Sequence, residues 1–96
     1  MKSITVIGRR WFERINGNTY HSAEIIIDGT FVHKIQFAYG YEDQYIQSAS
    51  EFLEEEGHIK LEKYNNSGFE MLWSYCKKHN IKYYATVTDV RRRKDL

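Results

Sequence analysis

Two glycine-containing turn signals divide the first forty residues into three segments with strand-like alternation. Asn16-Gly17 is the stronger signal, because a type I′ hairpin turn needs positive φ at both central positions and these residue types accept it. Asp28-Gly29 supplies the second turn. The flanking segments are rich in β-branched and aromatic residues, which favour strands. The sequence therefore predicts a three-stranded antiparallel meander.

The register of this meander follows from keeping apolar side chains on one face. Pairing around the first turn places Phe12 opposite His21. A three-residue second loop, 28–30, pairs Ile25 with His33 and is preferred because a two-residue loop would mix the two faces. The expected core face consists of Ile4, Val6, Phe12, Ala23, Ile25, Ile27, Phe31, Ile35 and Phe37. The opposite face, which we expect to meet solvent or a partner, carries Trp11, Tyr20, Glu24, Ile26, Val32, Lys34 and Gln36.

Two helices are predicted after the meander. The first begins after Asp43 and ends at Gly57, and its 3.6-residue stripe consists of Tyr45, Ile46, Ala49, Phe52 and Leu53. Residues 58–62 alternate and predict a short edge strand. A capping box of Ser67 and Glu70 then predicts the start of the second helix. The stripe of that helix consists of Phe69, Leu72, Trp73 and Cys76.

A final strand is predicted over 81–90, because this segment is β-branched and aromatic. One face of it carries Ile81, Tyr83, Ala85 and Val87. The predicted fold class is α+β, with an antiparallel sheet made of the meander and the C-terminal strand and with two helices packed on one face. We expect residues 1–90 to form a single domain and residues 91–96 to be a basic tail that frays.

Composition excludes several classes of protein. The net charge of +1 argues against a globally basic nucleic-acid binder and against an acidic DNA mimic, although local patches of either sign remain compatible with it. Apolar runs stay well below the ~18 residues of a membrane span, so no membrane partner is expected. A single cysteine excludes an internal disulfide and a cysteine-based metal cluster. A cytosolic chain, bacterial or viral, fits these features best.

Residues with catalytic chemistry do not converge on a recognisable signature. The four histidines have no cysteine or carboxylate at ligand spacing, so we expect His21 and His33 to be structural and no metal to be bound. Cys76 lies on the stripe of the second helix, near its C-terminal end, where a thiol is a small core residue and not a nucleophile. We therefore expect no catalytic residue, no cofactor and no enzymatic activity.

Two clusters are candidates for binding. The segment 39–45 joins the third strand to the first helix, and residues 42–56 contain six acids and no Lys or Arg. Aromatic and acidic side chains on a connecting loop are typical of recognition surfaces, although a well-packed connection explains them equally. The expected partner-binding residues are Tyr39, Tyr41, Glu42, Asp43, Glu54, Glu55 and Glu56.

The second cluster interleaves arginines with an aromatic ring on the first strand. Such a pattern binds single-stranded nucleic acid when bases stack on rings and phosphates meet arginine. Its members, together with the tail, are Arg9, Arg10, Trp11, Arg14, Arg91, Arg92 and Arg93. A solvated strand edge guarded by arginine is the competing interpretation.

Two stretches resemble a known family. The segments Arg10-Trp11-Phe12-Glu13-Arg14 and Gly17-Asn18-Thr19-Tyr20-His21-Ser22 match the pattern R-W-F-x-R-x-x-G-N-T-Y-H-S. Phe37 to Tyr41 and Gln44-Tyr45 extend the likeness. The pattern resembles small phage- and prophage-encoded accessory proteins whose function is unassigned. It covers about the first half of the chain, and Glu42 stands where the family leads us to expect a glycine.

The resemblance implies a short accessory gene of a mobile element, and small proteins of this kind often act by binding. The leading hypothesis is a non-enzymatic inhibitor of a host defence complex or nuclease, of anti-CRISPR type. One alternative is a nucleic-acid-binding regulator that uses the basic strand and tail. Another is an anti-defence sponge for a nucleotide signal. The uneven charge also suits self-association as a homodimer.

Overall fold

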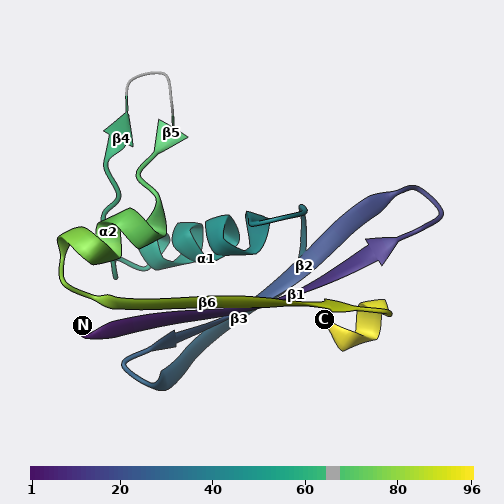
Figure 1. Cartoon of the computed structure of the whole chain (residues 1–96), viewed down its shortest axis with the longest axis horizontal. Coiled ribbons are helices and arrows are strands. Elements are labelled where there is room, and N and C mark those ends of the chain that lie inside the picture. Colours follow the sequence, from purple (N-terminus) through teal and green to yellow (C-terminus); the bar gives the residue numbers. More distant parts are fainter. Residues whose placement is uncertain (65–67) are drawn as a thin grey trace.

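The computed structural model describes residues 1–64 and 68–96 (Figure 1). In chain order the elements are β1 (Ser3–Glu13), β2 (Asn18–Ile27), β3 (Thr30–Tyr39), α1 (Gln44–Glu55), β4 (Lys63–Tyr64), β5 (Gly68–Phe69), α2 (Leu72–Lys78), β6 (Lys82–Val90) and the 3-10 turn η1 (Arg93–Asp95). Strands fill the first forty residues, helices follow, and one further strand completes the sheet. The predicted α+β class is confirmed.

The four-stranded main sheet has the order β3-β2-β1-β6. The pairs β1–β2 and β2–β3 are antiparallel, as predicted, but β6 runs parallel to β1. The expectation of a wholly antiparallel sheet is therefore wrong at this pair. After β3 the chain crosses the sheet through α1 and α2 and re-enters beside β1 in the same direction. A parallel pair requires a long crossover of this kind.

The core lies between the sheet and the helices. α1 packs across β2 and β1, whereas α2 contacts β6 and α1 near the edge of the sheet (Figure 1). The ring of Tyr45 covers the backbone of Gly8. The predicted faces of α1 and β6 both contribute to this core. The buried cluster consists of Ile4, Val6, Ala23, Ile25, Tyr45, Ala49, Leu53, Ile59, Leu72 and Cys76.

Two irregularities in β3 move aromatic side chains off the core face. The second turn has two residues, Asp28 and Gly29, both at positive φ, so Ile26 pairs with Phe31. The three-residue loop predicted from sequence is wrong. An extra residue in β3 then restores the predicted pairing of Ile25 with His33. Because the turn is one residue shorter than predicted, Phe31 lies on the face away from the helices, where it is exposed.

A second bulge has the same effect near the other end of β3. Ala23 pairs with Ile35 and His21 with Ala38, so Gln36 and Phe37 both lie opposite Ser22. The extra residue turns Phe37 away from the helices, and its ring stacks on Tyr20. The prediction that Phe37 faces the core is therefore wrong.

The β1–β2 hairpin is shifted by two residues from its predicted register. Glu13 pairs with Asn18 across a four-residue turn, and Phe12 lies opposite Thr19. A shift of two leaves every side chain on its predicted face, because side chains alternate with period two. Phe12 nevertheless is 54% exposed. The helix layer covers the strand at Gly8, and the β1–β2 hairpin extends beyond it (Figure 1). We call this part of the hairpin, residues 9–22, the arm.

The region between the helices departs most from prediction. Gly57 ends α1 as expected, with φ +77 and with a hydrogen bond from the amide of His58 to the carbonyl of Leu53. Residues 58–62 are not a strand, and β4 and β5 form a separate two-stranded ribbon. Ser67 of the predicted capping box lies outside the described residues. The helix starts only at Leu72, so Phe69 precedes it. Trp73 lies within the helix but is exposed, and only Leu72 and Cys76 of the predicted stripe are buried.

Glu70 is almost completely buried and anchors this region. Its carboxylate accepts a hydrogen bond from the amide of Glu62 at 3.2 Å and lies 3.0 Å from the ammonium of Lys78. Burial alone would raise the pKa of Glu70, but the hydrogen bonds from Lys78 and Glu62 outweigh it and hold the pKa below 4.5. The folded state therefore favours the ionised carboxylate.

Because the folded state lowers the pKa of Glu70, the free energy of unfolding depends on pH in the acidic range. The contribution of Glu70 is complete above the ordinary pKa of 4.5 and is lost as pH falls through the lower folded-state value. We expect the free energy of unfolding of Glu70→Gln to fall less steeply below about pH 4.5 than that of the unaltered protein. Urea denaturation across a pH series measures this. Glu55→Gln, at an exposed position, is the control, and equal slopes for all three proteins would refute the assignment.

Candidate functional site

A rigid loop joins β3 to α1 and presents one candidate surface. Gly40 has φ +144 and its amide donates to the carbonyl of Thr19 at 2.9 Å. Glu42 has φ +52, a conformation that favours glycine and is the position where the family resemblance leads us to expect one. Asp43 is the N-cap residue of α1, but its side chain makes no capping hydrogen bond. Backbone geometry therefore fixes the path of the loop.

His21 fixes this loop from below, a role that the sequence did not reveal. The imidazole is buried on the helix side of β2. Its Nδ1 lies 3.1 Å from the carbonyl oxygen of Gly40, and its Nε2 lies 2.7 Å from the hydroxyl of Ser48. One ring thus connects the sheet, the loop and α1. The structural role expected for His21 fits this geometry.

Large exposed apolar side chains lie on the β1–β2 hairpin and on the β3–α1 loop, whose Gly40 amide is bonded to Thr19 of β2. Phe12, Ile15 and Tyr41 are 54%, 92% and 58% exposed. The guanidinium of Arg10, on the same side of the sheet as Phe12, donates to the carbonyl of Glu42 at 3.3 Å and joins the arm to the loop. We name as the tip surface the residues Phe12, Ile15, Tyr41, Glu42 and Asp43. It combines three apolar side chains with two acidic ones.

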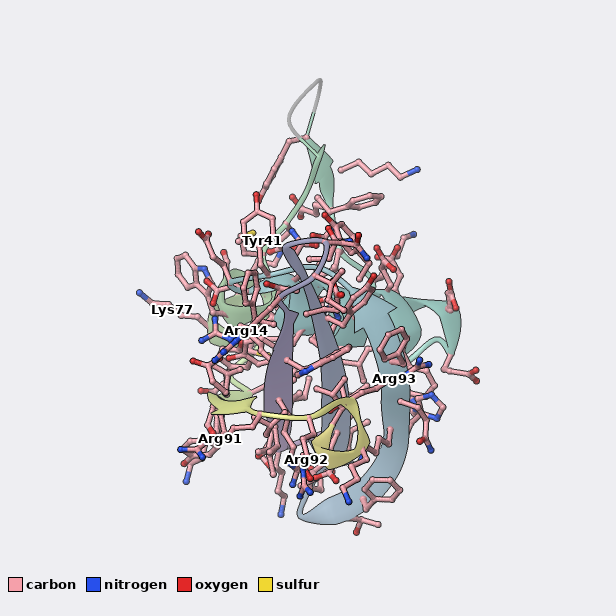
Figure 2. All side chains as sticks on the ribbon, turned by 90° about the vertical axis from the view of Figure 1, so that its right-hand side faces the viewer. Arg14, Tyr41, Lys77, Arg91, Arg92 and Arg93 are labelled. Carbon is pink, nitrogen blue, oxygen red and sulfur yellow. The ribbon has the colours of Figure 1, made fainter. Side chains whose placement is uncertain are left out.

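The tyrosines of the loop have different environments. Tyr45 is buried on Gly8, and burial raises the pKa of its hydroxyl. Tyr41 points outward, as expected (Figure 2). Tyr39 pairs with Tyr20 and lies against its ring on the opposite side of the sheet. The structure therefore separates Tyr39 from Tyr41.

The acidic residues at the end of α1 lie apart from the loop. Glu54, Glu55 and Glu56 are at the C-terminal end of the helix, whereas Glu42 and Asp43 precede its N-terminal end. A twelve-residue helix spans about 18 Å, so these acids do not form one cluster. Glu54 also accepts a hydrogen bond from the amide of Leu61 at 2.8 Å, which gives it a structural role.

A second candidate surface lies on the face of the sheet away from the helices. Trp11 stacks on Tyr20 with ring centroids 5.8 Å apart, and Tyr20 stacks on Phe37 at 4.7 Å. The edge contact of Tyr39 with Tyr20 extends the row. The guanidinium of Arg93 lies over Phe37, 4.3 Å from the ring centroid. We call these five residues the aromatic face.

The predicted basic residues do not all lie on this face. Arg9 shares it and pairs with Glu24 at 3.5 Å. Arg10 is on the helix side, paired with Asp89 at 2.9 Å. Arg14 lies in the exposed turn of the arm. Figure 2 looks onto this end of the molecule and shows Tyr41 toward the helices and Arg92 toward the opposite side.

Residues 91–96, predicted to fray, turn back onto the sheet. They bring Arg93 to Phe37, and Lys34 donates to the main-chain carbonyl of Leu96 at 3.1 Å. Arg92 pairs with Asp95 within η1. The parallel pairing of β6 with β1, which places Val90 beside Trp11, delivers the basic segment to the aromatic face.

Reactive groups are held in structural positions. Cys76 is a core residue, as predicted, and burial raises the pKa of its thiol to about 11. Within 1–64 and 68–96, no three His, Cys, Asp or Glu residues are placed to hold a metal ion. The groove of about 1060 Å³ between segment 60–63 and α2 is lined by Tyr75, Lys78 and His79 among others. Its lining residues include no arginine.

Comparison with other proteins does not assign a function to this chain. No helix in the described part of the chain is long and apolar enough to cross a membrane. Searches against protein-family models, curated proteins and solved structures find no match. The tip surface and the aromatic face are therefore the basis for proposing a function.

Proposed function

We propose that this protein is a non-enzymatic binding protein that inhibits a host defence complex, as anti-CRISPR inhibitors do, and that the tip surface contacts the target. The observation that carries the proposal is the exposure of three large apolar side chains: Phe12 and Ile15 on the protruding β1–β2 hairpin, and Tyr41 in the β3–α1 loop that Arg10 joins to β1. Isolated apolar side chains on a surface are common, but several on adjacent segments are typical of an interaction site.

The rigidity of the loop supports this proposal. Gly40 and Glu42 hold the backbone in its turn, and the buried His21 fixes the loop to β2 and α1. Tyr41 is therefore presented without a large loss of conformational entropy on binding. Aromatic anchors of this kind supply much of the binding energy at protein interfaces.

Charge suggests the character of the target. Glu42 and Asp43 are exposed and follow Tyr41 directly in the chain, so a basic partner surface complements this part of the tip surface. The groove with which a nuclease holds nucleic acid is such a surface. The likeness of the first half of the chain to phage accessory proteins supports the same context.

Tyr41→Ala tests the proposal. We expect the melting temperature to stay nearly unchanged, because the ring is exposed, while affinity for the target falls at least about thirtyfold. Tagged protein is used to capture its target from a host lysate, followed by mass spectrometry and sequencing of any nucleic acid. The captured complex is then assayed for target cleavage with and without added protein.

Matched variants separate the outcomes. Tyr84→Ala removes an equally exposed tyrosine from β6, far from the arm, and is expected to leave capture and inhibition intact. Charge reversal at Glu55 and Glu56 is expected to leave the affinity of the complex largely unchanged, because these acids lie at the other end of α1. Equal inhibition by unaltered protein and Tyr41→Ala would exclude the tip surface. A captured complex whose cleavage is unaffected would exclude the inhibitor function.

A further inference from the structure

We propose that the aromatic face binds single-stranded nucleic acid, with bases stacked on the ring row and phosphates held by Arg93 and its basic neighbours. This surface lies on the opposite side of the sheet from the helices, and the inference does not depend on the tip surface. It rests on the continuity of the rings, the distribution of charge and the position of the C-terminal segment.

The rings form a continuous row across three strands. Trp11 comes from β1, Tyr20 from β2 and Phe37 from β3, and the planes of successive rings are within 27° and 17° of parallel. Tyr39 adds an edge contact at 5.7 Å. Stacked rings on a sheet surface are the platform on which single-stranded nucleic acids lay successive bases.

The charge of this side is opposite to that of the rest of the molecule. On the strands the side chains directed away from the helices include three cationic residues, Arg9, Lys34 and Lys82, against Glu13 and Glu24, a net charge of +1. Residues 91–96 hold four cationic residues and one acid, a further +3. The whole chain is +1, so the remaining residues sum to −3. A polyanion is therefore attracted to this side.

The C-terminal segment places a planar group on the aromatic face where we expect a nucleic-acid base to stack. The planar guanidinium of Arg93 stacks over Phe37 at 4.3 Å, in the position a base would take on that ring. The segment is held by this contact and by the hydrogen bond between Lys34 and Leu96, both near the surface. A base can replace the guanidinium on Phe37, after which Arg93 and Lys34 are free to meet phosphates.

A buried hydroxyl lies beneath the same surface. Ser22 is between Tyr20 and Glu24 on β2, beside Arg9 on β1, and points away from the helices. It is completely buried, and among the described residues its Oγ has no hydrogen-bond partner. A buried hydroxyl without a partner costs free energy, so the protein itself does not satisfy this polar group.

Binding of labelled oligonucleotides tests the inference. Fluorescence anisotropy with oligo(dT) and oligo(U) of about fifteen nucleotides, a length that covers a small single-strand site, measures affinity over a range of salt. We expect binding that weakens steeply as salt rises, with duplex of the same length bound more weakly. In a Trp73→Phe background Trp11 is the only tryptophan, and its fluorescence should be quenched on binding.

Matched variants make the result decisive. Phe37→Leu, Arg93→Glu and Lys34→Glu are each expected to weaken binding at least tenfold, and all three positions are at least partly exposed, so folding should survive. Tyr84→Ala, on the same face but outside the row, and Lys77→Glu, on α2, are expected to bind normally (Figure 2). Absence of binding at low salt, equal affinity for duplex, or equal losses in Tyr84→Ala would overturn the inference. Tyr41→Ala should bind oligonucleotides normally, which separates this result from the fate of the proposed function.

Discussion

Replacing Ile25 by alanine is expected to lower the free energy of unfolding by about 2–5 kcal/mol, because its side chain is fully buried between β2 and the helices. The same replacement at Phe12 is expected to cost no more than about 1 kcal/mol, although the ring is larger, since more than half of it is exposed. Urea denaturation monitored by circular dichroism measures both variants.

Ile26 provides the internal reference for this comparison. It neighbours Ile25 on β2 but points away from the helices and is only partly buried, so Ile26→Ala should fall between the other two. The order Ile25, Ile26, Phe12 follows from burial alone. A loss at Phe12 equal to that at Ile25 would mean that the arm is packed in solution, and the tip surface would then be unavailable to a partner.

Gly8→Ala is expected to destabilise the protein by about 1–3 kcal/mol through overpacking. A Cβ atom at Gly8 would lie 2.4 Å from Cδ2 and 2.6 Å from Cγ of Tyr45, so the ring or the strand must move. The backbone itself does not oppose alanine, because Gly8 does not have positive φ. Without the ring, alanine would stabilise this strand position by roughly 0.5–1 kcal/mol relative to glycine.

A double-mutant cycle isolates the steric cause. Tyr45→Leu alone should destabilise the core, but the combined Gly8→Ala and Tyr45→Leu variant should be more stable than the sum of the two single effects predicts. Thermal or urea unfolding of the four proteins gives the coupling free energy. Strict additivity would show that the ring does not limit the space at Gly8, contrary to the packing of α1 on β1.

Local sequence patterns were sufficient to predict most of the helices and strands. The stripe from Tyr45 to Leu53 and the Gly57 stop predicted α1, because one amphipathic helix and its termination depend on neighbouring residues. The β-branched composition of 81–90 predicted β6. The direction of β6 depends instead on how the helices cross the sheet, which no local pattern records.

The errors at Phe31 and Phe37 arise from irregular pairing of β3. Alternation assigns both residues to the core, but the two-residue turn places Phe31 on the other face before an extra residue restores the register, and a second extra residue moves Phe37. A bulge leaves no mark in the hydrophobic pattern, because alternation continues on either side of it. The aromatic face could therefore not be assembled from sequence, although Trp11 and Tyr20 were correctly placed on that side.

The hydrogen bonds of His21 beneath the loop were not predicted, for a different reason. The absence of metal ligands at suitable spacing indicates a structural role for His21 but does not name its partners. Its partners, the carbonyl of Gly40 and the hydroxyl of Ser48, lie 19 and 27 residues away in the chain. A hydrogen-bonding role of this kind depends on register and helix position together, and the sequence pattern contains neither.

The parallel pairing of β1 with β6 affects how the chain reaches its native state. Arg10 and Asp89, which join these strands, are 79 residues apart. Contacts of such separation require closure of a long loop before they contribute any stability, and this slows folding. Until β6 docks, β1 leaves an unpaired strand edge on the growing sheet, with Val6 and Ile4 incompletely covered. We therefore expect a chain in which β6 has not docked to expose the edge of β1 to pairing with other chains.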